Sequence, residues 1–487
     1  MPPTNQDIPQ PPYPDSARWR LLAALAAAAA VLGGCTSFSP DGGFGPVEQT
    51  TKSRLGKDVQ WARSDDDRAT LARRVSELLT QPLTVDDAVQ VALLNNRGLQ
   101  ASFAELGIAE ADLVQAGRLP NPGFSFARLR RGGEVELERG FHFNLAQLIA
   151  MPMIRQVESR RFARTQGDTA MAVLSLAAAT RKAYFNALAA EETVRYMHQV
   201  KQTAEASAEL ARRMQAVGNF NKLQRAREQA FYADAALNLA RAEQAQRATR
   251  ERLTRLLGVW GARADGPAGF TLPERLPDLP KAPEDRPDIE RVAMAQRLDV
   301  QGAKLMAEQT AQNLGLTKAT RFINVLELGA VHNSSNVEPT QRGWEIGVEL
   351  PLFDGGGART ARAEAVYLQA VNRAAETAVN TRSEVREAYG AYRSAFDIAM
   401  HQRDELVPLR QLIAEENVLR YNGMLIGVFE LLADARLQIA SVNSYIEALR
   451  DFWIAQADLE MALIGRPSLS AAAGPAPAGT DVGGAGH

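Results

Sequence analysis

Apolar residues recur along this chain with two different periods. In two segments they fall alternately three and four positions apart, which is the spacing of helices that pack as coiled coils. These residues are Val385, Tyr389, Tyr392, Phe396 and Ala399 in one segment and Leu432, Ala435, Ile439, Val442, Ile446, Leu449 and Trp453 in the other. The pattern predicts long helices, in coiled coils or in a plain helical bundle, because both arrangements give this spacing. Residues 358–407 hold no proline, so Pro408 predicts a break or kink before Gly423.

Other segments alternate between apolar and polar residues with a period of two, as strands do. In the first half of the chain, Val135, Leu137, Phe141, Phe143 and Leu145 share one face, and Glu136, Glu138, His142 and Asn144 the other. In the second half, Trp344, Ile346, Val348 and Leu350 alternate with Glu345, Gly347 and Glu349, beside a partner strand with Leu326, Leu328 and Ala330. We expect strand pairs in 123–147 and 323–350. A membrane barrel with a wet interior and a half-buried soluble sheet would both alternate in this way.

The order of these elements repeats along the chain. Arg181-Lys182-Ala183-Tyr184 recurs as Arg386-Glu387-Ala388-Tyr389 at an offset of 205, and Gly218 pairs with Gly423 at the same offset. Leu256-Leu257-Gly258 and Leu463-Ile464-Gly465 each end a helical segment, 207 positions apart. We interpret this as a tandem duplication of a long helix, a strand pair, a long helix, a break at glycine and a further long helix. The expected halves are 83–265 and 288–466, joined by a proline-rich linker at 266–287.

The N-terminus resembles a bacterial export signal. Arg18 and Arg20 precede an apolar run, 21–32, that is too short to span a bilayer. The run ends in Leu32-Gly33-Gly34-Cys35, which resembles the lipobox at which lipoproteins are cleaved and acylated. We therefore expect 1–34 to be a lipoprotein signal peptide and Cys35 to carry the lipid. An ordinary signal peptide followed by a chance cysteine is the alternative, and the absence of aspartate after Cys35 favours the outer membrane.

The remaining segments complete the expected organisation. Residues 35–82 show little periodicity and predict an extended, lipid-anchored segment, and the Ala/Gly/Pro-rich tail 467–487 is typical of disorder. After the signal, no run of about 18 apolar residues remains, so a spanning structure would have to be a β-barrel. About four strands per chain cannot close a barrel alone, because the smallest membrane barrels have about eight. Several chains would therefore have to share one barrel.

The chain resembles the TolC family of outer-membrane efflux channels over residues 83–466. The resemblance rests on stretches that match, in order, the family's opening helix, the approach to its first strand, the exit from its last strand, and the turn and helix at its periplasmic tip. These stretches are Leu83-Thr84-Val85-Asp86-Asp87-Ala88 with Ala92-Leu93-Leu94-Asn95-Asn96, Leu119-Pro120-Asn121-Pro122, Leu350-Pro351-Leu352-Phe353-Asp354-Gly355-Gly356, and Tyr421-Asn422-Gly423 with Phe429-Glu430-Leu431-Leu432-Ala433-Asp434-Ala435-Arg436.

The resemblance implies a mainly α fold with a small β part. Duplicated coiled-coil hairpins would form a periplasmic tube, and each chain of a homotrimer would give four strands to a twelve-stranded outer-membrane barrel. The implied function is the exit duct of a tripartite efflux system, which passively conducts drugs or metal ions from an inner-membrane pump and a periplasmic adaptor protein to the exterior. The alternatives are a periplasmic coiled-coil scaffold lipoprotein without a pore and the exit duct of a type I protein secretion system.

The resemblance also implies where a gate and a docking site would lie. Family members constrict the pore with an acidic ring near the tip, for which Asp434 is the first candidate and Glu430 the second, with Arg436 as a neighbouring cation. Asp434 lies further beyond Gly423 than the family pattern places it, so an exposed helix carboxylate paired with Arg436 or another neighbour is the alternative. The turns that resemble adaptor-docking sites are Val217-Gly218-Asn219 and Asn422-Gly423-Met424. The alternative is a simple helix break, at which glycine takes a conformation that other residues avoid.

Composition narrows the remaining functions. The net charge of -2 over 487 residues shows no electrostatic bias toward nucleic acid. The five histidines are too dispersed for a metal-binding motif, and Gly355-Gly356-Gly357 is not followed by the lysine of a phosphate-binding loop. Met151 and Met153 flank Pro152 without a further soft ligand, which favours packing over copper binding. We find no catalytic set, and expect neither an enzyme nor a cofactor.

Overall fold

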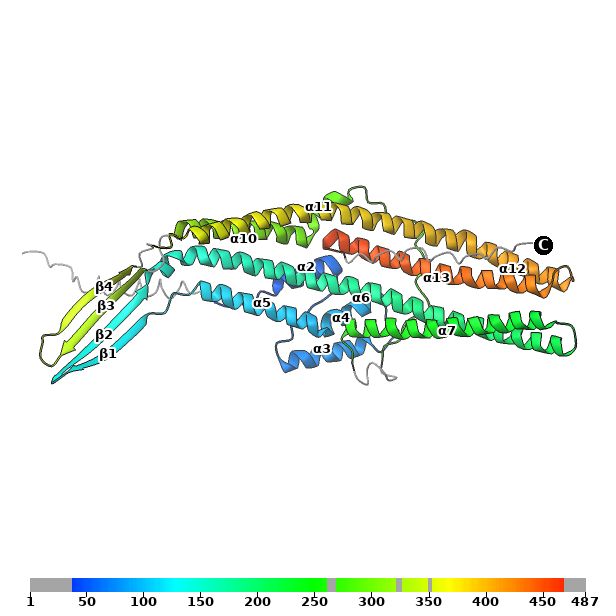
Figure 1. The fold of residues 1–487 in the computed structure, drawn as a ribbon, viewed down its shortest axis with the longest axis horizontal. Helices are drawn as coiled ribbons and strands as arrows, with labels where there is room; N and C mark the ends of the chain where they lie inside the picture. Colours follow the sequence, from blue (N-terminus) through cyan, green and yellow to red (C-terminus); the bar gives the residue numbers. More distant parts are fainter. Residues whose placement is uncertain (1–36, 261–268, 321–325, 349–352, 468–487) are drawn as a thin grey trace, which may run out of the picture. The chain divides into compact units, whose positions relative to one another are not determined.

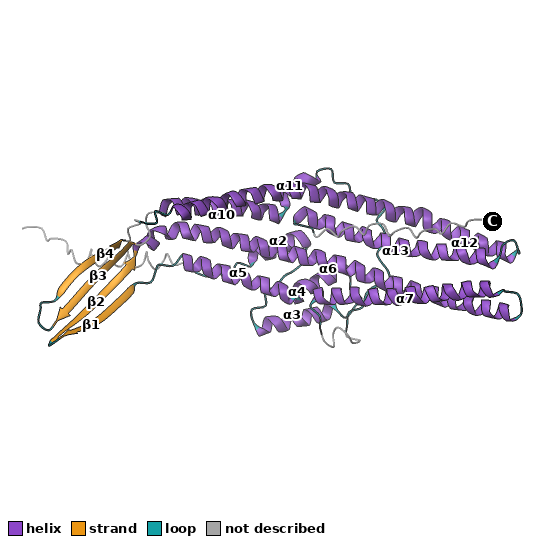
Figure 2. Ribbon diagram, in the orientation of Figure 1, coloured by secondary structure: helices purple, strands orange, loops and turns teal. Residues whose placement is uncertain are grey.

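The computed structural model describes residues 37–260, 269–320, 326–348 and 353–467 (Figure 1). The chain forms two compact units. The first comprises 1–42, 108–162 and 311–364, and the second comprises 43–107, 163–310 and 365–487. The strands belong to the first unit, and the described part of the second is helical apart from its turns and loops (Figure 2). The predicted fold class, mainly α with a small β part, is confirmed.

Four strands form one antiparallel sheet in the order in which they occur along the chain. They are β1 (Gly123–Arg131), β2 (Glu134–Asn144), β3 (Leu326–Ser335) and β4 (Gln341–Val348). Both predicted strand pairs are present, and β2 pairs with β3, so the two halves of the chain share the sheet. The prediction that Leu145 continues a strand is wrong. The Asn144 side chain accepts a hydrogen bond from the Gln147 amide at 2.8 Å and so caps a helix that begins at Leu145. Leu350 lies outside the described residues.

The helices follow the predicted order twice, with one addition. The first half contains α4 (Val85–Asn95), α5 (Arg97–Ala116), α6 (Leu145–Ala216) and α7 (Lys222–Leu257), and the second contains α9 (Ile289–Gln296), α10 (Leu298–Thr320), α11 (Gly357–His401), α12 (Val407–Asn422) and α13 (Val428–Ile464). The predicted opening helix is two helices in each half, because Asn96 and Arg297 adopt extended backbone conformations. Asn96 accepts a hydrogen bond from the Leu99 amide, so its side chain caps α5.

The path between α11 and α12 contains a π-helical turn, η1 (Gln402–Leu406). The turn lies just before Pro408, which lacks an amide hydrogen and would clash with the carbonyl four residues earlier in a regular helix. A π turn holds one extra residue, which relieves that conflict without ending the helix. The predicted irregularity at Pro408 is therefore confirmed, as a widened turn.

The prediction that 35–82 is extended is wrong for its described part. Helices α2 (Gly45–Leu55) and α3 (Asp65–Leu78) occupy much of it. Ser64 and Asp67 form a capping box at the start of α3, in which each side chain accepts a hydrogen bond from the other residue's backbone amide. Gly56 ends α2 in a left-handed conformation with φ +62°. These cap signals were present in the sequence, but the weak apolar periodicity of the segment hid them.

The main hydrophobic core lies in the second unit. It contains all predicted seam residues of α11, such as Val385 and Phe396, and those of α13 from Val442 onward. Ile439 packs instead against a smaller cluster around Val200. The described part of the predicted linker also joins this core, because Phe270, Leu276 and Leu279 are buried in it. The seam prediction is confirmed for α11 and for α13 from Val442 onward, whereas Leu432 and Ala435 lie outside the described core clusters. The linker is anchored by apolar packing.

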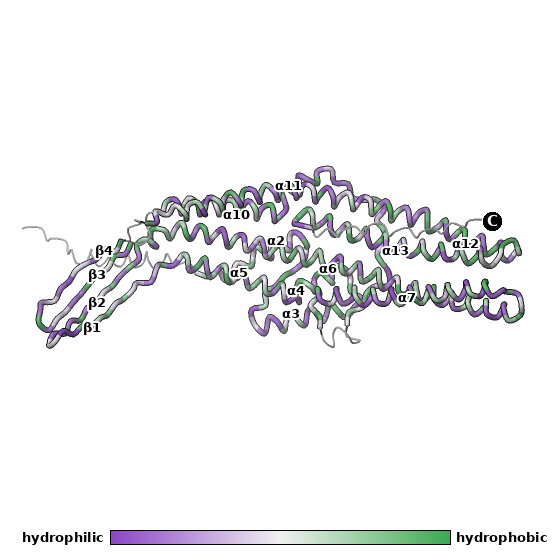
Figure 3. Tube along the Cα trace, in the orientation of Figure 1, coloured by the Kyte–Doolittle hydropathy of each residue, from purple (hydrophilic) through white to green (hydrophobic). Residues whose placement is uncertain are grey.

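Polar and apolar residues are mixed along every long helix (Figure 3). Within the described ranges, no helix is both long and apolar enough to cross a membrane.

Candidate functional site

The strand register assigns the side chains of the sheet to two chemically different faces. We call them the polar face and the apolar face. Because directly paired residues of neighbouring strands point to the same side, the register decides which residues share a face. All five glutamates of the described strands fall on the polar face: Glu134, Glu136, Glu138, Glu327 and Glu345. These glutamates lie on β2, β3 and β4, whereas β1 has none and places Arg128 and Arg130 on the apolar face.

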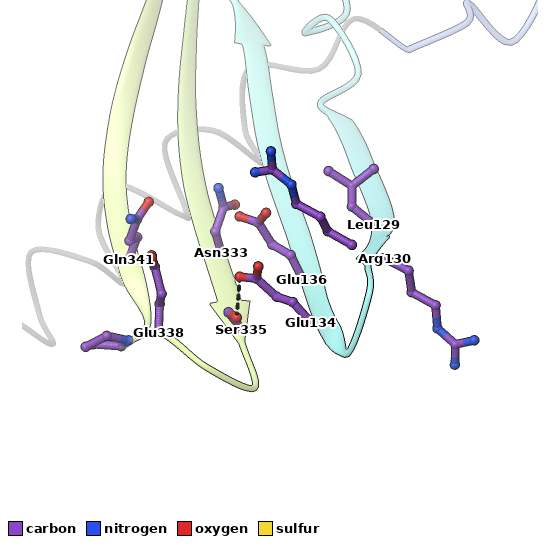
Figure 4. A pocket seen from close by; sticks show the side chains of 10 residues that line it. Leu129, Arg130, Glu134, Glu136, Asn333, Ser335, Glu338 and Gln341 are labelled. Carbon is purple, nitrogen blue, oxygen red and sulfur yellow. Dashed lines mark hydrogen bonds between the residues drawn. The ribbon is translucent and has the colours of Figure 1, made fainter.

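The polar face is hollowed next to the two hairpin turns (Figure 4). The hollow has a volume of about 390 Å³, and Glu134, Glu136, Asn333 and Gln341 contribute to its wall. Ser335 donates a hydrogen bond to the Glu134 carboxylate at 3.1 Å, which joins β3 to β2. Arg131 also lines the hollow, so its wall is polar and carries charges of both signs, which suits contact with water.

The apolar face carries the large hydrophobic side chains, and they are exposed. Phe124, Phe141, Trp344, Ile346 and Val348 are each more than half exposed, and Trp344 reaches 74%. A monomeric soluble domain rarely exposes so many large apolar residues on one sheet face. This face is therefore suited to contact with an apolar environment.

The two predicted tip turns both belong to the second unit. Gly218 follows α6 with φ +83°, and the amide of Asn219 donates to the Met214 carbonyl at 2.9 Å. In the second turn, the left-handed residue is Met424, with φ +61°, and the Leu425 amide donates to the Arg420 carbonyl at 2.9 Å. The matching hydrogen bonds pair Gly218 with Met424, at an offset of 206.

The predicted pairing of Gly218 with Gly423 is thus wrong by one residue. Gly423 has an ordinary φ of -78°. Equivalent positions of the two halves are 205 residues apart before η1, as in Tyr184 and Tyr389, and 206 residues apart after it. The difference is the one residue that the π turn adds. Val217, Met424 and Leu425 are strongly exposed, so the two turns present apolar side chains to their surroundings.

The three gate candidates lie on α13 in different surroundings. The carboxylate of Asp434 accepts a hydrogen bond from the side-chain amide of Asn417 on α12, so it joins the two helices of one hairpin. Asp434 and Arg436 do not pair with each other. Glu430 is exposed in the first turn of α13.

Arg436 connects the hairpins of the two halves. Its guanidinium lies 3.7 Å from the carboxylate of Glu228 on α7 and 4.3 Å from the ring centre of Phe231. Glu228 is buried, with 2% of its side chain exposed, and also accepts a hydrogen bond from Ser207 of α6 at 2.8 Å. Sequence reasoning missed Glu228, because no periodic signal relates a glutamate of the first half to an arginine of the second.

The structure tests few of the other sequence predictions. Within the described ranges, no cluster of three or more His, Cys, Asp or Glu side chains is arranged to hold a metal ion. Cys35 lies outside those ranges, so its lipidation stays a prediction.

Comparison with solved structures defines the fold class. The outer membrane channel CmeC of Campylobacter jejuni matches with a TM-score of 0.63 at 16% sequence identity, over 95% of this chain and 94% of that chain. The outer membrane protein VceC of Vibrio cholerae matches with a TM-score of 0.65 at 17% identity, over 78% of this chain and 96% of that chain. The chain therefore has the fold of these outer-membrane channels.

Sequence comparison gives one more specific likeness. The chain is 27% identical over 292 residues to the cobalt-zinc-cadmium resistance protein CzcC of Cupriavidus metallidurans. The match covers 56% of this chain and 63% of that protein, which is less than two thirds of its length. No protein-family model matches the chain.

Proposed function

We propose that this protein is the outer-membrane exit channel of a tripartite efflux system. Three chains would each give β1–β4 to one twelve-stranded barrel, and the duplicated hairpins would form the periplasmic conduit. The observation that carries the proposal is the separation of the sheet into an exposed apolar face and a face that holds all five strand glutamates. A shared barrel needs this separation, because lipid contacts one face and water the other.

We further propose that the substrates are metal cations. Carboxylates along a water-filled passage raise the local cation concentration and disfavour anions. The likeness to a cobalt-zinc-cadmium resistance protein supports the same substrate class. Transport would be passive here, since the energy would come from an inner-membrane pump.

Two features of α13 would serve as the gate. Asp434 holds α12 and α13 together through Asn417, and Arg436 holds α13 against α7 through Glu228. In a trimer, symmetry would bring equivalent carboxylates of Glu430 together around the axis, which would attract cations to the closed tip. Opening would require the contact between Arg436 and Glu228 to break.

The two tip turns would dock a periplasmic adaptor protein. Val217, Met424 and Leu425 are exposed apolar residues beside Gly218 and Gly423, and such residues are suited to burial in a protein interface. A lipid on Cys35 would anchor the N-terminus to the outer membrane.

The first experiment measures assembly and conductance together. Purified protein is run in detergent with and without heating, next to the Cys35→Ala variant, and is then added to planar bilayers. We expect a heat-labile trimer that forms pores, and a loss of lipid mass in the variant. A monomer released from membranes by salt, without pores, would contradict the proposal and favour a scaffold lipoprotein.

A further inference from the structure

The apolar face of the sheet changes its chemistry along the strands. Toward the helix connections it carries successive rows of apolar residues, in which Phe143, Leu328 and Ile346 align, followed by Phe141, Ala330 and Trp344. In the next row toward the hairpin turns, Arg139, His332 and Arg342 pair directly across β2, β3 and β4. We call these three residues the basic row.

Two more arginines extend the basic row on β1. Arg128 pairs with Leu137 and Arg130 with Val135, and both arginines point to the apolar face. Because all five strand glutamates lie on the polar face, the described strands place no carboxylate among these arginines and His332. If these arginines formed ion pairs within the sheet, glutamates would lie on the same face. Because the glutamates lie on the opposite face, the arrangement indicates an external anionic partner.

The position of the row identifies that partner. Arg342 lies two residues from Trp344 on the same strand, which is about 7 Å. On β2, β3 and β4 the apolar residues therefore give way to basic residues within one row, whereas β1 adds Phe126 to that row. Long arginine side chains reach from an apolar surface toward an aqueous interface. A ligand that fits both parts has a hydrocarbon portion and an anionic head.

We propose that the basic row binds the phosphates of lipid headgroups while the neighbouring apolar rows contact the acyl chains. The inference rests on the proposed function, because it requires the apolar face to lie against a membrane. Guanidinium groups suit phosphates because they can donate two parallel hydrogen bonds. The row would select anionic lipids at the outer rim of the barrel and fix its depth in the membrane.

The fluorescence of Trp344 can report which lipid lies next to the basic row, because Trp344 shares the apolar face with Arg342. The full chain is reconstituted in phosphatidylcholine that contains phosphatidylglycerol, with brominated acyl chains on either lipid in turn. Quenching of Trp344 by each lipid gives the ratio of their binding constants. Subtracting the signal of Trp344→Phe removes the contribution of the other tryptophans.

We expect the wild type to prefer phosphatidylglycerol. Arg342→Gln should lower that preference by up to about fivefold, and Arg139→Gln in addition should lower it further. The matched control is Arg131→Gln, which removes the same charge from the polar face of β1 and should leave the ratio unchanged.

Three outcomes would contradict the inference in different ways. An equal ratio in wild type and Arg342→Gln would mean that the row does not select lipids. Loss of the preference on adding inorganic phosphate would mean that it binds a free anion. If brominated chains fail to quench Trp344 in either lipid, the sheet does not face lipid, and the proposed function fails as well.

Discussion

The guanidinium of Arg436 on α13 lies 3.7 Å from the carboxylate of Glu228 on α7, and this ion pair joins the closing helices of the two halves. The pair is asymmetric, because Glu228 is buried whereas 41% of the Arg436 side chain is exposed. Water screens the charge of Arg436, so the attraction between the two side chains is modest. The buried carboxylate of Glu228 would nevertheless be destabilised if it lost this partner.

Arg436→Gln should weaken the contact between the hairpins by about 1 kcal/mol per chain, equivalent to about a fivefold shift toward separation. We expect a higher resting conductance in planar bilayers and no change in trimer formation. Arg420→Gln, an exposed arginine at the end of α12, is the control and should conduct as the wild type does. Equal conductance in all three proteins would argue against a gating role for the pair.

The left-handed residues of the two turns should respond in opposite directions to substitution. Gly218→Ala should destabilise the protein by about 1 kcal/mol, and Met424→Gly should stabilise it by a similar amount, because a side chain disfavours positive φ. Gly423→Ala serves as the control, since its φ is ordinary and an added Cβ would lie 3.5 Å from the nearest atom. Thermal unfolding measures all three, and a destabilised Met424→Gly would contradict the assignment.

Tyr184 gives the stability a defined pH dependence. Its hydroxyl donates to the Leu83 carbonyl at 2.9 Å, and burial raises its pKa to about 12. An unfolded tyrosine has a pKa of about 10, so this contribution is present below pH 10 and is lost as the pH rises through 12.

Tyr184→Phe should therefore cost about 1 kcal/mol at neutral pH and flatten the decline in stability between pH 10 and 12. Tyr389→Phe is the matched control at the repeated position, where the hydroxyl donates to an exposed Asp285 carboxylate. Urea unfolding at several pH values measures the difference. Parallel pH curves for wild type and Tyr184→Phe would count against it.

The glutamates of the polar face should set the charge preference of the channel. Replacing Glu136, Glu138 and Glu345 by glutamine should move the reversal potential in a potassium chloride gradient toward zero, because cations lose their advantage over anions. Arg131→Gln, on the same face, should move it in the opposite direction. An unchanged potential in both variants would mean that these strands do not line the conducting path.

Arg297 should be the most sensitive structural arginine of the second half. Its side chain is 1% exposed and donates to Asp299 at 2.6 Å and to Glu384 at 2.7 Å. Arg297→Met would remove the buried cation that two partly buried carboxylates share, and Glu384 would keep only exposed Arg466 at 3.9 Å. We expect a cost of about 3–5 kcal/mol. The exposed Arg291 of α9 is the control, and Arg291→Gln should leave the thermal midpoint unchanged.

The sequence predicted the elements whose signal is periodic. The alternation at 135–143 and 344–348 depends on which side chains meet water, and the seam at Val385 and Phe396 depends on which face meets another helix. Both are properties of the local chain, so they could be recognised before the structure was known. The segregation of Glu136 and Glu345 to one face of the sheet follows from the same alternation.

The missed features depend on contacts between distant residues or on small shifts of register. The breaks at Asn96 and Arg297 are stabilised partly by groups far along the chain, such as Glu384 for Arg297. The partner of Arg436 lies on α7, which no local pattern indicates. Gly423 looked like the left-handed residue of its turn, but the extra residue in η1 assigns that conformation to Met424.

The π turn at Gln402–Leu406 also has a consequence for symmetry. In the proposed trimer, a duplicated chain would offer six hairpin ends, and a perfect duplication would make them equivalent around a six-fold axis. The additional residue is present only in the second half, so one end presents Gly218 where the next presents Met424. The two kinds of hairpin end would alternate around the ring. A partner protein would therefore meet two different binding sites in alternation.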